Sequence, residues 1–149
     1  KRRGILRENI LLAKELWTKD EASFSGKHIQ FESSWAWPKP TTKPHPPILM
    51  GGAAGPKTAA HIAEFCDGWM PLGGMYDFEG GMKNVADACK AIGRDPSSLQ
   101  ISVFYGMGCP DADTIKKHAD QGVKRVICAL PPQPADAALP MLDQYAKNI

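Results

Sequence analysis

The spacing of apolar residues changes along the chain, and each change predicts a different element. Near the start, apolar side chains recur every three or four positions, the spacing of one face of an α-helix, at Leu6, Ile10, Ala13 and Trp17. A helix is therefore predicted from about residue 3 to residue 18. Next, Phe24 and Phe31 flank Ser25-Gly26, a turn-type dipeptide, which predicts a short hairpin.

Residues 33–47 carry no such periodicity. Five prolines interrupt this stretch, and proline fixes φ and withholds a backbone donor, so an extended and irregular loop is predicted. Trp35 and Trp37 lie in it. If they were exposed, these indoles would mark a binding surface. We expect them instead to pack under the loop or across a dimer interface.

From residue 48 onward, short apolar runs alternate with helical stripes. Strands are predicted at 48–50, 67–71, 99–105 and 123–130, and helices at 56–65, 78–92 and 113–121, followed by a final helix. The last helix is expected to present Ala138, Leu142, Tyr145 and Ile149 on one face. Strands that alternate with helices predict a parallel α/β sheet. The first and last of these strands are apolar on both faces, as in a sheet covered on both sides.

Four β-α units span only about a hundred residues, whereas a closed (β/α)8 barrel needs eight strands and ~250 residues. Four strands alone expose two sheet edges, which proteins avoid. The chain also begins within a helical pattern and without Met. We therefore expect residues 1–149 to form one partial domain, the C-terminal half (β5–β8) of a TIM barrel. Residues 1–47 would lead in, and residues 48–149 would supply the four units.

Composition excludes several classes of partner. The net charge is +2 and the longest basic run is Lys1-Arg2-Arg3, so no nucleic-acid surface is expected. No apolar stretch approaches the ~20 residues that span a bilayer, and no signal peptide is visible. The four cysteines are scattered without metal-ligand spacing. They predict free thiols in a reducing compartment such as the cytoplasm, and no metal site.

The segment Gly51-Gly52-Ala53-Ala54-Gly55 lies between a predicted strand and a predicted helix. Small residues let a ligand approach the backbone, and the N–H groups of the following helix favour an anion. Phosphate binding and a plain tight turn are both compatible with this spacing. Lys57 and Thr58 could add a charge or a hydroxyl. A nucleoside-triphosphatase phosphate loop is excluded, because Pro56 replaces its second glycine and removes a donor.

Other candidate residues each have a structural alternative. Trp69 follows Asp67-Gly68 at a strand end, where barrel active sites are built, so it would line a pocket or fill the core. Arg125 would support an anion near the mouth or form an ion pair. His61 and His118 are expected to be solvated on helix surfaces. None of the histidines has a partner typical of a catalytic triad.

Several segments resemble the luciferase-like monooxygenase family. They are ENILLAKELW (8–17), PPILMGGAAGPKTAAHIAEFCDGWMPL (46–72), AIGRDPSSLQISV (91–103) and GVKRVICALP (122–131). These segments are similar to the branch of the family that uses the deazaflavin coenzyme F420 rather than FMN. This resemblance implies that residues 51–55 hold the cofactor's phosphate. It also implies that residues from the first four strands meet the reactive ring, so no catalytic residue is assigned here.

We therefore expect a fragment of a flavin- or deazaflavin-dependent oxidoreductase or monooxygenase, acting on a small molecule and forming a homodimer. This half would supply the cofactor-phosphate loop and part of the substrate cavity, and would be inactive alone. An FMN-dependent monooxygenase is the alternative within the same class. A non-catalytic half-barrel that self-associates and binds phosphate-bearing ligands is the alternative outside it.

Overall fold

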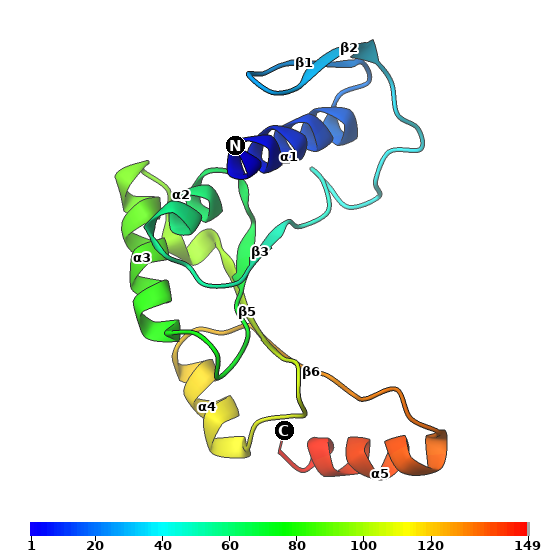
Figure 1. Cartoon of the computed structure of the whole chain (residues 1–149), viewed down its shortest axis with the longest axis vertical. Coiled ribbons are helices and arrows are strands. Elements are labelled where there is room, and N and C mark those ends of the chain that lie inside the picture. Colours follow the sequence, from blue (N-terminus) through cyan, green and yellow to red (C-terminus); the bar gives the residue numbers. More distant parts are fainter. Residues whose placement is uncertain (149) are drawn as a thin grey trace. The chain divides into compact units, whose positions relative to one another are not determined.

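The computed structural model describes residues 1–148, and the chain divides into two compact units, Lys1–Ile48 and Leu49–Ile149 (Figure 1). The first unit holds α1 (Arg2–Thr18) and a two-stranded antiparallel sheet of β1 (Ala22–Ser25) and β2 (Gln30–Ser34). Both the first helix and the hairpin predicted from the sequence are thereby confirmed.

The buried carboxylate of Glu8 joins α1 to the hairpin within this first unit. Glu8 is only 6% exposed and accepts hydrogen bonds from the backbone N–H groups of Lys27, His28 and Ile29, at 3.0, 2.7 and 2.9 Å. Burial by itself raises the pKa of Glu8, but these three hydrogen bonds outweigh it and lower the pKa. The turn of the hairpin is therefore built around a charged group of the helix.

The second unit contains the predicted alternation of strands and helices. The strands are β3 (Leu49–Gly51), β4 (Gly68–Met70), β5 (Gln100–Tyr105) and β6 (Arg125–Cys128). The helices are α2 (Pro56–Phe65), α3 (Phe78–Ala91), the 3₁₀ turn η1 (Pro96–Ser98), α4 (Ala112–Asp120) and α5 (Ala135–Ala146). The strands form one sheet in the order β3-β4-β5-β6, and every pair is parallel.

Helices α2, α3 and α4 lie along one side of this sheet (Figure 1). The register supports the same arrangement, since Trp69 of β4 pairs with Ile101 of β5 and both are buried. Trp69 stacks on Phe78 of α3, and Tyr105, which lies on the same face of β5 as Ile101, hydrogen-bonds His118 of α4. Sequential strand order with helices on a single face is the arrangement of a barrel wall.

The core of the second unit lies between the sheet and these helices. It contains Ala59, Ile62, Phe65, Trp69, Val85, Cys89, Ile101 and Val103. Side chains that alternate with these along the strands face the side of the sheet without α2, α3 or α4. In β5 and β6 the paired residues Ser102 and Arg125 lie on that other face, as do Phe104 and Ile127.

Two expectations from the sequence were wrong in detail. The first and last strands of the sheet are not buried on both faces. Leu49 and Met50 are only half-buried, as are Val126 to Ala129, and Arg125 is exposed. The final helix, Ala135–Ala146, leaves Leu142 45% exposed, so the predicted packing stripe is only partly buried. Ile149, the last residue of that stripe, lies outside the described residues.

The two tryptophans of the proline-rich segment do not pack beneath it. Trp35 is 77% and Trp37 is 63% exposed, and Lys39 places its Nζ 5.1 Å from the ring centre of Trp37. Packing across a dimer interface stays a prediction. Within residues 1–148, no helix is both long enough and apolar enough to cross a membrane.

Candidate functional site

The predicted glycine-rich loop follows the carboxyl end of β3 and leads into α2. Gly51 is the last residue of the strand, and Gly52 has φ 87°, a conformation that glycine adopts without strain. A Cβ placed on Gly52 or Gly55 would meet no heavy atom of the described chain within 4 Å. Gly51, Ala53 and Gly55 are exposed, so the loop is open to a ligand on its outer side.

Two carbonyl groups of this loop are held by side chains from the helix side of the sheet. The indole Nε1 of Trp69 donates to the carbonyl of Gly52 at 2.8 Å, and the Asn84 amide donates to the carbonyl of Ala54 at 3.0 Å. Carbonyl oxygens repel an anion. Occupying these two with donors removes part of that repulsion and fixes the loop's shape.

The N-terminus of α2 differs chemically from those of α3 and α4. Asp77 caps α3 and Asp111 caps α4, through hydrogen bonds to Gly80 N at 2.9 Å and Thr114 N at 2.8 Å. Gly55 occupies the equivalent position of α2, and no side chain in the described chain caps that helix. The first turn of α2 also has no acidic residue. Its positive dipole end is therefore free of the carboxylates that fill this position in the neighbouring helices.

Trp69 lies in the core rather than on a cavity wall. Its side chain is 0% exposed, and its ring stacks on Phe78 with centres 5.6 Å apart and planes 10° apart. A Cβ on Gly81 of α3 would approach the Trp69 ring to 2.3 Å, so the helix packs directly against the indole. The structure thus makes Trp69 a positioning residue for the loop, through its bond to Gly52.

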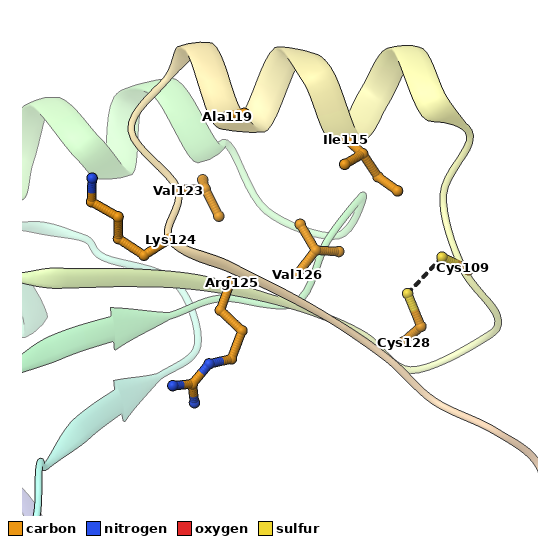
Figure 2. Close-up of a pocket in the computed structure, with 8 residues that line it drawn as sticks. All are labelled: Cys109, Ile115, Ala119, Val123, Lys124, Arg125, Val126 and Cys128. Atoms are coloured by element: carbon orange, nitrogen blue, oxygen red, sulfur yellow. Dashed lines mark hydrogen bonds between the residues drawn. The ribbon is translucent and has the colours of Figure 1, made fainter. Parts of the chain in front are cut away.

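Arg125 does not belong to this loop. Figure 2 shows its side chain pointing away from α4, on the face of β6 opposite to Val126 and Ile115. It lies three strands away from Gly51 along the sheet order, roughly 14 Å at ~4.8 Å per strand. Support of an anion by Arg125 elsewhere on that face stays a prediction.

His118 is buried, contrary to the expectation of a solvated helix residue. It is 8% exposed, its Nε2 lies 2.9 Å from the Tyr105 hydroxyl, and its ring meets Phe78 edge-on at 5.3 Å. Burial lowers the pKa of His118, which favours the neutral imidazole. The helical pattern did not reveal this burial, because the packing partner Tyr105 is thirteen residues away.

One cysteine pair in the structure was not predicted from the sequence. Within residues 1–148 none of the four cysteines forms a disulfide. Nevertheless, Cys109 and Cys128 place their Sγ atoms 2.6 Å apart, beside a hollow of about 230 Å³ between α4 and β6 (Figure 2). Nineteen residues separate them, and no motif spacing links them. No group of His, Cys, Asp and Glu suited to a metal ion occurs in the described residues.

Comparison with known proteins gives the family. Residues 1–127 match the family described as luciferase-like monooxygenase. The uncharacterized protein Rv0953c of Mycobacterium tuberculosis is 34% identical over the whole chain, and that match covers 51% of Rv0953c. The chain therefore spans about half the length of this relative.

Two further matches involve different cofactors. The FMNH2-dependent dimethylsulfone monooxygenase of Pseudomonas putida is 36% identical to this chain. The match covers 42% of this chain and 16% of the length of that monooxygenase. The solved structure of an F420-dependent secondary alcohol dehydrogenase in complex with an F420-acetone adduct is 16% identical. The structural match covers 99% of this chain and 53% of the dehydrogenase chain. Its TM-score of 0.59 indicates a shared fold. The chain belongs to the luciferase-like monooxygenase family.

Proposed function

We propose that this chain is the C-terminal half of a (β/α)8-barrel oxidoreductase that binds a deazaflavin or FMN, and that residues 51–55 cradle the cofactor's phosphate. The loop and the N-terminus of α2 carry this proposal. The α2 dipole end is free of acidic side chains, and donors from Trp69 and Asn84 hold two loop carbonyls. These features fit a phosphate group, which needs exposed N–H donors and no competing carboxylate.

In this proposal the described residues bind and orient rather than react. The loop and the first turn of α2 hold the phosphate, and Lys57 adds a positive charge in that turn. The face of the sheet without α2, α3 or α4 forms part of the cavity wall. A deazaflavin or flavin supplies the electron chemistry when bound. The groups that meet its reactive ring come from the other half of the barrel, so this half alone is inactive.

Two similar proteins, each named for a different cofactor, support the proposal that this chain binds a flavin or a deazaflavin. One relative is named for FMNH2, and a structural neighbour is named for F420. A phosphate site is common to a deazaflavin and to FMN, so the loop does not discriminate between them. We favour the deazaflavin, because the sequence segments resemble the F420-dependent branch of the family.

Titration of the parent-length protein with each cofactor tests this function. The protein is expressed with its upstream coding sequence, and deazaflavin and FMN are titrated separately while fluorescence is followed. Tight binding of either supports the oxidoreductase assignment and identifies the branch. Binding of neither overturns it.

A charge at Gly55 tests the loop itself. Gly55 has an extended backbone and open space around its Cα, so a side chain fits there without strain. Gly55→Asp caps α2 as Asp77 caps α3, but it places a carboxylate in the proposed phosphate site. Gly55→Asn provides an equally good cap without the charge. We expect Gly55→Asp to weaken cofactor binding by at least tenfold relative to Gly55→Asn, while both fold. Equal affinities would exclude this loop as the phosphate site.

One observation favours a second candidate, a half-barrel module that self-associates and only binds phosphate-bearing ligands. In the described sheet, β3 and β6 are terminal strands, each with one unpaired edge. A second copy could cover these edges instead of the missing strands. Sedimentation of the 149-residue chain distinguishes the two. A discrete dimer that binds phosphate, together with a redox-inactive parent-length protein, would favour the module.

A further inference from the structure

The chain that leaves β5 turns back and runs beside the end of β6. Gly108 and Ala129 form an antiparallel bridge there, and Ala129 N donates to the Tyr105 carbonyl at 2.8 Å. In an antiparallel pair, the residue after one partner lies opposite the residue before the other. Cys109 is therefore the cross-strand neighbour of Cys128, the last residue of β6.

The separation of directly opposed residues suits a disulfide. Directly opposed residues of an antiparallel pair generally have Cα atoms about 4.5–5.5 Å apart. Disulfide-linked residues have Cα atoms about 4.4–6.8 Å apart, so the two ranges overlap. Both side chains also point to the same side of the pair. In Figure 2 the two Sγ atoms face each other, and their distance is 2.6 Å. No rearrangement of the backbone is needed to join them.

We propose that Cys109 and Cys128 form a reversible intrachain disulfide when hydrogen peroxide oxidises them, and that this bond fastens the loop of residues 106–111 to the end of β6. The loop lies between β5 and α4, at the carboxyl end of the sheet. This is the end at which barrel enzymes build their sites. The site is thus a modification site, separate from the glycine-rich loop after β3.

The oxidation proceeds in two steps. The Cys109 thiolate attacks one oxygen of hydrogen peroxide, and the O–O bond breaks to give a sulfenic acid and hydroxide, which becomes water. The Cys128 sulfur then attacks the Cys109 sulfur, the S–O bond breaks, and a second water leaves with the thiol proton. Two electrons pass from the two thiols to one peroxide molecule. A dithiol reductant reverses the reaction.

The surroundings of the sulfur atoms set the order of attack. Burial and the neighbouring Cys109 raise the pKa of Cys128 to about 11, so Cys128 is held as the thiol and Cys109 attacks first. Cys66 and Cys89 are 1% and 0% exposed in the core, which shields both from peroxide.

Peptide mapping of the purified chain tests the proposal. The reduced protein is treated with hydrogen peroxide, quenched, alkylated under denaturing conditions and digested with trypsin. We expect alkylatable thiols to fall from four to two, and a new species that joins peptides 95–116 and 126–147. The almost fully exposed Met107 lies in the first peptide, so the species carries one or more sulfoxide oxygens. Dithiothreitol should restore the separate peptides.

Two pairs of variants complete the test. Cys109→Ser and Cys128→Ser should each abolish the linked species, whereas Cys66→Ser and Cys89→Ser should retain it if they fold. The linked form should also melt several degrees above the reduced form, because it closes a loop of about twenty residues. Four alkylatable thiols after oxidation would overturn the proposal. So would links between other cysteines, or links only between two chains on a non-reducing gel.

Discussion

The indole N–H of Trp69, in the core beneath α3, holds the carbonyl of Gly52 in the exposed loop after β3, at 2.8 Å. This bond connects the most completely buried aromatic residue of the second unit to the proposed cofactor loop. The loop conformation therefore depends on core packing as well as on glycine. A change in the core should be detectable at the ligand site, and the reverse should hold when a ligand orders the loop.

Replacing Trp69 with Phe should destabilise the protein and loosen the loop. The substitution removes the N–H donor and part of a fully buried ring, which together cost about 2–4 kcal/mol. Urea unfolding measures the loss, and hydrogen exchange of the loop amides measures the loosening. Trp35→Phe is the matched control, because Trp35 is 77% exposed and should change stability by less than about 0.5 kcal/mol. Similar losses for both variants would contradict this account.

Gly81 should tolerate a side chain only when the Trp69 ring is smaller. Gly→Ala within a helix ordinarily stabilises by about 0.5–1 kcal/mol. At Gly81 the new Cβ would meet the outer edge of the Trp69 indole at 2.3 Å, so Gly81→Ala should instead cost about 1–3 kcal/mol.

A double-mutant cycle measures this coupling. In the Trp69→Phe background the clashing ring atoms are gone, and Gly81→Ala should lose most of its cost. If the two substitutions have additive effects on the free energy of unfolding, α3 does not pack against the Trp69 indole at Gly81.

The order of elements could be predicted because each one depends on local patterns. Pro56 at the start of α2, the Asp77 cap of α3 and the 3.6-residue stripes act over a few residues, and the structure confirms each helix. The ends of the last strand were less predictable. β6 spans only Arg125–Cys128, since strand pairing depends on a distant partner rather than on the apolar run itself.

Long-range placement explains what the sequence left open at the candidate site. The face to which Trp69 points depends on its register with Ile101, thirty-two residues away. Likewise, the approach of Cys109 to Cys128 depends on how the chain turns after β5. The family resemblance predicted the α/β fold with a parallel sheet, which the structure confirms, but it did not locate these contacts.

Burial of His118 should make stability depend on pH just below neutrality. The pKa of His118 is lowered from 6.5, first by burial and then by Lys117, so the unfolded chain binds a proton more readily than the folded one. The resulting stability is present above about pH 6.5 and is lost as pH falls toward the folded pKa. Thermal unfolding between pH 7.5 and 5 should show this loss for the wild type.

His118→Gln removes the titration and should flatten this part of the pH profile, although it lowers stability overall. His61→Gln is the control, because His61 of α2 is only half-buried and its ring is tilted against that of Phe65. An unchanged slope in His118→Gln would assign the pH dependence to another group.

Glu8 should control stability in a lower pH range than His118. Burial raises its pKa, but the hydrogen bonds from His28, Ile29 and Lys27 lower it below 4.5 on balance. Its contribution is therefore complete above about pH 4.5 and is lost as pH falls through the lower, folded-state pKa.

Glu8→Gln keeps the size but replaces one acceptor oxygen with an N–H2 group that opposes the backbone donors. At pH 7 this variant should melt several degrees below the wild type. The gap should close as the wild-type carboxylate protonates. Glu32→Gln, on exposed strand β2, is the control and should match the wild type throughout. If Glu8→Gln and Glu32→Gln have the same melting temperature at pH 7, the carboxylate does not hold the hairpin turn to α1.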